Sequence, residues 1–309
     1  MITVLAGGVG AARFLRGLTA VVPGDEVTAI VNVGDDLDRF GLRICPDLDS
    51  ITYWLAGVVH PEQQWGRADE RHVVAGELER FGHESWFTLG DRDLGVHLHR
   101  SMRLREGLGL AAVTAEVTAA FGLEPTLLPV TDDPARTIIT TTDGRELYFQ
   151  EYWVRERAAP GVAGVRLEGA ADARPAPGVI EALVDADTVI IAPSNPVVSI
   201  DTILAVPGIR EALATTAAPV IGVSPIIGGE VVRGMAHKLL PAIGVEVSAR
   251  GVARHYGDLL DGFVIDRVDA DQLGDIEAAG IPVRATDTLM DDPAVAAELA
   301  RTCLTLARS

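Results

Sequence analysis

The sequence predicts an α/β protein with a doubly wound, mostly parallel, Rossmann-like sheet and a small antiparallel β insertion. Three observations predict this fold class. A short apolar run at the N-terminus leads through glycines into a helical pattern. Short apolar runs alternate with helical patterns again from residue 177 to the C-terminus, and the stretch between these two parts carries a hairpin signal.

The N-terminal part predicts a βαβ unit. Ile2–Leu5 is an apolar strand, the glycines of Gly7–Gly10 form a turn, and Ala11–Leu18 continues as a helix. Val27–Val33 is a continuous apolar run, which is typical of a strand buried on both faces of a parallel sheet. The glycine loop and the residues after the second strand are therefore expected at the same edge of the sheet.

The next part of the chain is mainly helical in pattern. The expected helices are Asp47–Gly57, Ala68–Phe81, Leu94–Leu104 and Leu110–Phe121, and Trp86–Leu89 is a candidate strand. Acidic residues in the first turn of the first helix suit the positive end of its dipole.

From residue 126 the pattern changes to short extended segments. The candidates are Leu127–Val130, Arg136–Thr142 and Glu146–Val154. The pair Asp143–Gly144 between two of them is a hairpin turn signal. We therefore predict an antiparallel insertion over 126–172, within a Rossmann-like core made of 1–125 and 173–309.

Regular alternation of helices and strands resumes at Pro177. The expected helices are Val179–Val184, Ile200–Val206 and Ile209–Leu213, and the expected strands are Thr188–Ala192, Val220–Val223, Val245–Val247, Gly262–Ile265 and Ile281–Val283. Ligands of such sheets bind beyond the carboxyl ends of the strands, so functional residues are expected in the loops that follow the strands.

The composition narrows the function classes. With 309 residues, of which 48% are hydrophobic and 23% charged, the chain can bury a large core. A net charge of −18 without a Lys/Arg cluster argues against nucleic-acid binding. Cys45 and Cys303 are too few for a disulfide framework. Neither a signal peptide nor an apolar run of about 18 residues is present, so we expect a cytoplasmic protein without a membrane span.

The glycine loop is a candidate phosphate cradle, with a tight strand-to-helix turn as the alternative. Gly8 and Gly10 would let backbone N–H groups approach an anion at the start of a helix. Arg13 occupies the position of the third glycine of the dinucleotide fingerprint, and no Gly-Lys-Ser/Thr follows as a Walker loop requires. Arg13 is either a phosphate partner or a solvated helix arginine.

Aspartates cluster after the second strand. Asp35, Asp36, Asp38, Asp47 and Asp49 fall within fifteen positions. Asp35 lies where a nicotinamide enzyme keeps its ribose-binding acid, so an oxidoreductase is one alternative. One ribose needs one acid, however, and neighbouring carboxylates repel one another unless a cation or a dipole offsets them. The cluster favours a hard cation such as Mg²⁺, with helix capping or solvent exposure as the alternative for Asp38, Asp47 and Asp49.

Two further loops follow predicted strands. They contribute the candidate substrate-binding residues Ser194, Asn195, Ser199, Ser224, Gly228 and Gly229. Their position at the functional edge of the sheet favours substrate contact, although such loops also serve simply as helix starts. No Gly-x-Ser-x-Gly elbow or setting for a nucleophilic cysteine is present, which disfavours a covalent mechanism.

Other polar residues have two interpretations each. Asn32 ends the second strand beside the aspartates and is a substrate-binding candidate. Asp91 and Arg92 either cap a surface helix or present a donor fork to a phosphate or heterocycle. His97 and His99 do not share a helix face, and a packed or exposed role is expected for His97 rather than acid–base chemistry.

Seven segments, taken together, carry a family resemblance. They are GGVGAARFLRGL, NVGDDLDRFGLRICPDLDSITYWLAG, LGDRDLGVHLHR, LPVTDDP, FQEYWVR, APSNPVVSID and VSPIIGGEVVRG. In this order they cover nearly the whole chain and resemble the 2-phospho-L-lactate transferase family of coenzyme F420 biosynthesis, CofD, called FbiA in actinobacteria. The sequence departs from the family at Asp201, where glycine is expected, and at Met235–His237, where a glycine-proline-alanine run is common.

The resemblance implies a Mg²⁺-dependent transfer to the deazaflavin Fo. The donor would be guanosine diphosphate joined to a three-carbon acid, giving a 2-phospho-L-lactate or a phosphoenolpyruvate group. The ribityl hydroxyl of Fo would attack the phosphorus attached to the acid, forming F420-0 or dehydro-F420-0 and releasing GMP. The resemblance also implies a homodimer.

The residues and the resemblance together assign roles. Asp35 and Asp47 are the predicted catalytic residues, and with Asp36 and Asp49 they are the predicted Mg²⁺ ligands. The predicted substrate-binding residues are Gly8, Gly10, Arg13, Asn32, Asp36, Asp49, Asp91, Arg92, Ser194, Asn195, Ser199, Ser224, Gly228 and Gly229.

Two alternative functions use the same scaffold. YvcK-type proteins resemble regulators that bind a nucleotide or nucleotide sugar without established turnover. The segments Cys45–Asp49 and Gly90–Asp93 favour the transferase, because an acceptor pocket would explain them. An NAD-dependent oxidoreductase is weakened by the missing third glycine and the surplus aspartates.

Overall fold

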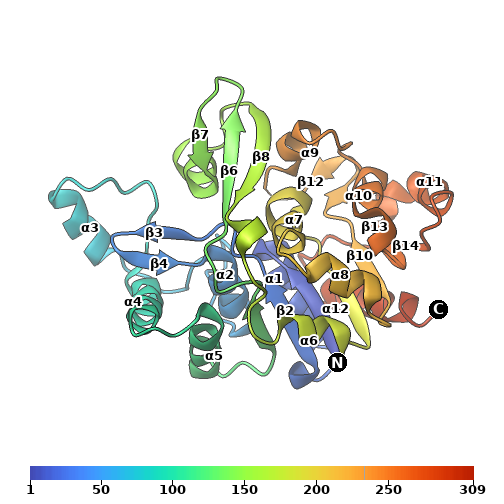
Figure 1. The fold of residues 1–309 in the computed structure, drawn as a ribbon, viewed down its shortest axis with the longest axis horizontal. Helices are drawn as coiled ribbons and strands as arrows, with labels where there is room; N and C mark the ends of the chain where they lie inside the picture. Colours follow the sequence, from blue (N-terminus) through green and yellow to red (C-terminus); the bar gives the residue numbers. More distant parts are fainter. Residues whose placement is uncertain (233) are drawn as a thin grey trace.

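A seven-stranded parallel sheet forms the centre of the protein (Figure 1). The structure, a computed structural model, describes residues 1–232 and 234–309. In the order in which they neighbour one another, the strands are β14 (Val283–Thr286), β13 (Gly262–Asp266), β10 (Val220–Val223), β9 (Thr188–Ile191), β1 (Ile2–Ala6), β2 (Val27–Val31) and β5 (Thr126–Pro129). All neighbours pair parallel, so the predicted doubly wound fold is confirmed.

Helices surround this sheet and connect its strands. They are α1 (Gly8–Thr19), α2 (Pro46–Leu55), α3 (Val73–Arg80), α4 (Asp91–Arg105), α5 (Leu110–Ala120), α6 (Val179–Val184), α7 (Asp201–Leu204), α8 (Ile209–Thr215), α9 (Ala236–Ala242), α10 (Ala249–Tyr256), α11 (Leu273–Glu277) and α12 (Pro293–Leu306). The chain also forms two π-helical turns, Glu151–Arg155 and Pro196–Ile200, and several short 3₁₀ turns. Within the described parts of the chain, no helix combines the length and apolar character needed to cross a membrane.

The central strands are buried because their sequences are apolar on both faces. Every residue of β1, β2, β9 and β10 is buried, as the continuous apolar runs predict. Helix α1 packs against both α2 and α12. The starts of α1 and α2 are adjacent, because a Cβ atom at Gly7 would lie 2.9 Å from Asp47 Oδ2. The glycine loop and the aspartate cluster are thereby brought together.

The antiparallel sheet is smaller than the predicted insertion. Strand β6 (Arg136–Thr141) lies between β7 (Glu146–Tyr148) and β8 (Val162–Glu168). The segment Leu127–Val130, which we expected to belong to this insertion, instead supplies β5 and pairs with β2 as the edge of the parallel sheet. We propose that the insertion begins after β5. It projects from the core in Figure 1.

Two hairpins lie beside the site edge of the central sheet. Strands β3 (Leu37–Arg39) and β4 (Leu42–Ile44) form one, which extends away from the core towards α3 in Figure 1. Strands β11 (Ile226–Ile227) and β12 (Glu230–Val231) form the other. Both hairpins follow strands of the central sheet.

Three predicted strand segments differ in the structure. Trp86–Leu89 is not a strand, because the buried Leu89 and the half-buried Phe87 pack near β4 and α4 rather than pairing with another strand. Val245–Val247 is a loop between α9 and α10 whose valines pack on the core. The second half of Glu146–Val154 forms a helical turn rather than a strand. A loop whose apolar side chains pack on the core has the same sequence pattern as a buried strand.

The chain changes direction across the sheet between β1 and β9. Strands that follow β1 in sequence lie on one side, β2 and β5, whereas β9 begins the other half. Ligands of doubly wound sheets bind at such a switch point. The loops that follow β1 and β9 meet there: a Cβ atom at Gly10 would lie 2.3 Å from the carbonyl oxygen of Pro193.

This close approach predicts a strong effect of Gly10→Ala. The added methyl group would force apart the loops after β1 and β9, and overpacking of this kind costs about 1–3 kcal/mol. We expect a lower free energy of unfolding, measured with denaturant. The control is Gly95→Ala, on the exposed side of α4 with open space around it, where alanine favours the helix. Equal stability of both variants would contradict the close approach.

Candidate active site

A cavity of about 510 Å³ opens at the switch point. The loop after β1 forms one side, where the Gly7 N–H donates to Ser194 Oγ at 3.1 Å across the switch point. Ten of the predicted site residues line the cavity: Gly8, Gly10, Arg13, Asp35, Asp47, Asp49, Ser194, Asn195, Ser199 and Ser224. The structure therefore brings together residues from loops that are far apart in sequence.

Asp35 and Asp47 form a buried pair at the cavity. Asp35 follows β2, and Asp47 lies in the first turn of α2, where Pro46 begins the helix. Both carboxylates accept hydrogen bonds from one amide group: Asn32 Nδ2 lies 3.2 Å from Asp35 Oδ1 and 2.9 Å from Asp47 Oδ2. Asn32 is itself fully buried and is not among the cavity-lining residues, so it holds the pair from behind.

Burial makes ionisation of this pair costly. Burial raises the pKa of Asp35 well above its usual value, and the neighbouring Asp47 raises it further. Burial also raises the pKa of Asp47, to about 6, although hydrogen bonds from Asn32 and the Gly8 backbone oppose this rise. In the described parts of the chain, no Lys, Arg or His forms an ion pair with either carboxylate. Two buried carboxylates without a basic partner are a donor set that suits a hard cation.

The pKa shifts predict how stability depends on pH without added metal. A raised carboxyl pKa stabilises the fold at low pH, and this contribution is lost as the pH rises through the folded-state pKa. For Asp47, stability is lost over the pH range between its usual pKa of 3.8 and its raised pKa of about 6. The loss is on the order of 3 kcal/mol. We therefore expect Asp47→Asn to gain stability relative to the wild type between pH 4 and pH 7, measured by denaturant unfolding.

Added Mg²⁺ should reverse this trend in the wild type. A cation binds the deprotonated carboxylates, so it should raise the melting temperature more at high pH than at low pH. A pH-independent stability difference between wild type and Asp47→Asn would contradict the raised pKa of Asp47.

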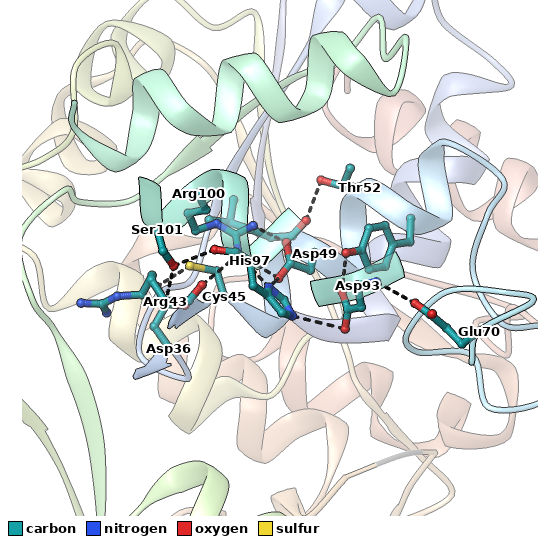
Figure 2. A network of polar contacts seen from close by, with 12 residues as sticks. Asp36, Arg43, Cys45, Asp49, Thr52, Glu70, Asp93, His97, Arg100 and Ser101 are labelled. Carbon is teal, nitrogen blue, oxygen red and sulfur yellow. Dashed lines mark hydrogen bonds and ion pairs between the residues drawn. The ribbon is translucent and has the colours of Figure 1, made fainter. Parts of the chain in front are cut away.

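A second polar network lies beside the pair (Figure 2). The buried Arg100 donates to both carboxylate oxygens of Asp49, with Nη1–Oδ2 at 3.2 Å, and its Nη1 lies 3.3 Å from His97 Nδ1. His97 Nε2 lies 3.3 Å from Asp93 Oδ2, and Tyr53 donates its hydroxyl to Asp93. Asp49, Tyr53, Asp93 and His97 line the cavity, whereas Arg100 lies behind them. The network is a rigid, hydrogen-bonded wall.

The network around Arg100 has little uncompensated negative charge with which to bind a metal cation. Asp49, Asp93 and His97 place potential ligand atoms within 4.8 Å of one another, so these three residues could hold a metal. The Arg100 guanidinium, however, already neutralises Asp49. Burial opposes the charge on Asp93, yet hydrogen bonds from His97 and Tyr53 hold its pKa below its usual value. The Asp35–Asp47 pair, which has no cation partner among the described residues, is the stronger candidate.

Comparison with known proteins shows the family. The model of the family described as 2-phospho-L-lactate transferase CofD matches residues 2–295. The chain belongs to the CofD family. The family resemblance is thereby confirmed, and with it a transferase of coenzyme F420 biosynthesis that acts on small molecules.

Related CofD-family sequences carry a more specific name. A protein of Kitasatospora aureofaciens named phosphoenolpyruvate transferase is 52% identical over 99% of this chain and 97% of its own. A protein of the same name from Streptomyces coelicolor is 50% identical over 99% of this chain and 98% of its own. Among solved structures, protein BH3568 of Bacillus halodurans, described as a member of the upf0052 family, has a TM-score of 0.68. It is 19% identical over 98% of both chains, a likeness that shows the fold alone.

Asp36 does not reach the cavity of this CofD-family chain. It is buried, accepts a hydrogen bond from Cys45 Sγ at 3.0 Å and lies on the Arg100 side of the cluster (Figure 2). Burial raises its pKa to about 7, against the opposing effects of Cys45 and Arg43. The neighbours Asp35 and Asp36 thus serve different networks, because the chain turns at Gly34–Asp35, where the Asp36 N–H donates to the carbonyl oxygen of Val33.

Arg13 lines the cavity but is held by protein groups. Its Nη1 donates to Asp291 at 2.9 Å, its Nη2 donates to Gln64, and its guanidinium lies 5.6 Å from the centre of the Trp54 ring. A phosphate would have to compete with these partners. The predicted phosphate role of Arg13 stays a prediction.

Four other predicted residues lie outside the cavity lining. Asp91 accepts hydrogen bonds from the backbone at the start of α3, and the exposed Arg92 donates its backbone N–H to Glu70. Gly228 and Gly229 form the left-handed turn of the β11–β12 hairpin, with φ of 59° and 76°. The Gly228 N–H already donates to a buried aspartate, so it is not free for a phosphate.

Several cavity residues were not predicted from the sequence. They are Tyr53, Trp65, Asp93, Phe149, Gln150 and Trp153. One signal was available: Asp93, His97 and Arg100 follow a spacing that places them on one face of a helix. The packed role expected for His97 agrees with its burial, but its contact with two carboxylates was not foreseen.

Proposed function

We propose that this CofD-family chain transfers a phosphoenolpyruvate group from a guanosine-diphosphate-linked donor to the ribityl hydroxyl of Fo. The products would be dehydro-F420-0 and GMP, and Mg²⁺ would be the cofactor. The name of the relatives that are about half identical supports the enolpyruvyl rather than the lactyl group. The observation that carries the proposal is the single cavity that joins the glycine loop, the Asp35–Asp47 pair and an aromatic-rich wall.

The first turn of α1 is suited to the diphosphate. The N–H groups of Val9 and Gly10 lie in the first helical turn, where backbone donors lack intrahelical partners and the helix dipole is positive. Gly8 has a φ of 68°, a backbone conformation that side chains other than glycine rarely adopt. On the opposite side of the switch point, Asn195 accepts hydrogen bonds from two backbone N–H groups and fixes the loop after β9.

The carboxylate pair would serve both the proton and the phosphates. The ribityl oxygen forms a bond to the phosphorus that carries the enolpyruvyl group, the bridging phosphorus–oxygen bond breaks, and GMP leaves with the electron pair. The hydroxyl proton passes to the carboxylate pair, which lies at the cavity wall. Asp35 and Asp47 would also hold Mg²⁺, which when bound neutralises phosphate charge.

Asp49 would position the acceptor. Arg100 holds both its oxygens from the buried side, so the carboxylate has one fixed orientation at the cavity wall. A fixed carboxylate can accept a hydrogen bond from a ribityl hydroxyl and orient the attacking group, and such positioning accounts for much of the rate of phosphoryl transfer.

The test is the stoichiometry of GMP release. Protein, Mg²⁺ and the enolpyruvyl donor should release GMP only when Fo is added, and one phosphodiester-linked deazaflavin should form for each GMP. Nucleotide binding without GMP under any donor would favour a YvcK-type regulator instead. Tight binding of a nicotinamide cofactor without binding of Fo would favour an oxidoreductase.

We also propose that the chain forms a homodimer and acts in the cytoplasm. The dimer is inferred from the family resemblance. The cytoplasmic location is inferred from the low cysteine count. Sedimentation equilibrium at several protein concentrations would test the dimer, which a monomeric mass throughout would exclude.

A further inference from the structure

We propose that Gln150 and Trp153, on the insertion, bind a planar heterocycle by its hydrogen-bonding edge and its face. The heterocycle would carry a ring N–H next to a carbonyl group, an amide-type edge that a glutamine side chain can pair with through one donor and one acceptor. The proposal rests on the proposed function, because both substrates named there contain such a ring.

The first observation is an amide that faces the cavity and has no partner in the protein. Gln150 is 7% exposed and lines the cavity. Within residues 1–232 and 234–309 its side chain makes no hydrogen bond to the protein. The amide atoms are not fully buried, so water in the open cavity can reach them. A ligand that displaces this water would have to replace its hydrogen bonds. A ligand in the cavity would supply the missing partners.

The second observation is the face on which Gln150 lies. Phe149, Gln150, Trp153 and Val154 line the cavity, whereas the residues between them point elsewhere. This is the spacing of one face of a helix. Trp153 is 38% exposed although it faces a cavity. An aromatic face beside a free amide suits a flat ring that stacks on one and pairs with the other.

The helical turn that carries these residues is held in place. Between the two lining pairs, the buried Tyr152 donates its hydroxyl to the carbonyl oxygen of Pro160 at 2.9 Å. Lys238, on α9, donates to the carbonyl oxygen of Ala158 in the same insertion. The amide of Gln150 is therefore presented from a fixed backbone, and π-helical turns such as this one are frequent at functional sites.

Two ligands share the required chemistry. The pyrimidinedione ring of the deazaflavin has an N–H between two carbonyl groups, and the guanine of the donor has an N–H beside one. Either ring could pair with Gln150 and stack on Trp153. Gln150 and Trp153 of the insertion would then determine which heterocycle binds beside them in the cavity.

The test compares the binding of Fo and of GDP to the purified protein and its variants. Gln150→Leu keeps the size of the side chain but removes its hydrogen bonds, so we expect the dissociation constant of one of the two ligands to rise about tenfold or more. The other ligand should bind as before, which shows that the variant is folded. The affected ligand identifies the heterocycle.

Tryptophan variants extend this test. Trp153→Ala should weaken the same ligand as Gln150→Leu. The control is Trp86→Ala, because Trp86 does not line the cavity and instead packs edge to face with Phe87 and under the guanidinium of Arg39. Unchanged binding of both ligands by Gln150→Leu, or equal weakening of both, would overturn the proposal. Equilibrium binding needs no turnover, so a failure of the transfer reaction itself would be seen separately.

Discussion

Asp47→Asn and Asp35→Asn are each expected to lower the turnover of the transferase by about two orders of magnitude or more. The asparagine amide has the size of the carboxylate but lacks the charge needed to hold a cation and to accept a proton. Each substitution also relieves the repulsion between two buried carboxylates. We therefore expect the melting temperature at neutral pH to stay the same or to rise. Steady-state release of GMP, measured beside thermal unfolding, tests both expectations.

The control for these variants is Asp172→Asn, at an exposed position of the insertion that does not line the cavity. It removes one negative charge from the surface and should leave turnover unchanged. Full activity of both Asp35→Asn and Asp47→Asn would show that the pair caps α2 and orders the loop after β2 without taking part in the reaction.

Arg100→Met is expected to have the largest effect on stability. The guanidinium is 2% exposed and holds both oxygens of Asp49, and methionine would leave that carboxylate buried without a cation. Removal of one partner from a buried ion pair costs about 3–5 kcal/mol. Denaturant unfolding should show this loss in full. Adding Asp49→Asn to the variant should restore part of the stability, since it removes the unpaired charge.

The same helix offers a matched control. Arg103 is on α4 as well, and its guanidinium forms ion pairs with Glu106 and Glu116 at the surface. Exposed ion pairs contribute about 0–1 kcal/mol, so Arg103→Met should change the unfolding free energy little. If Arg100→Met were as mild as Arg103→Met, the network of Figure 2 would not be a structural wall of the site.

Much of the fold could be predicted because local patterns determine it. Two predicted elements agree with the structure residue for residue: the strand Val220–Val223 and the helix Val179–Val184. A short apolar run indicates a strand, and a short amphipathic run indicates a helix. The strand β5 was assigned to the wrong sheet. Its sequence shows that it is extended, but its partner β2 lies about a hundred residues earlier and leaves no local trace.

Part of the candidate site could also be predicted from the sequence, because the order of strands and loops follows from local patterns. Loops after strands of a doubly wound sheet meet at one edge, so Asp35, Asp47 and Ser194 could be grouped before the structure was known. The division of the aspartates between two networks could not be predicted. It depends on Arg100, which lies about fifty residues from Asp49 in sequence and reaches it only through the packing of α4 against β4. Gln150 was missed because a lone glutamine has no sequence signature.

The mass of the deazaflavin product shows both whether the protein is a transferase and which donor it uses. Protein, Mg²⁺ and Fo are mixed with equal amounts of the enolpyruvyl and the lactyl guanosine-diphosphate donors, and the product is identified by mass spectrometry. We predict that the enolpyruvyl phosphodiester of Fo forms in excess, lighter than the lactyl product by two hydrogen atoms, together with an equal amount of GMP. Formation of neither phosphodiester would contradict the transferase, and an excess of the lactyl product would contradict the proposed donor.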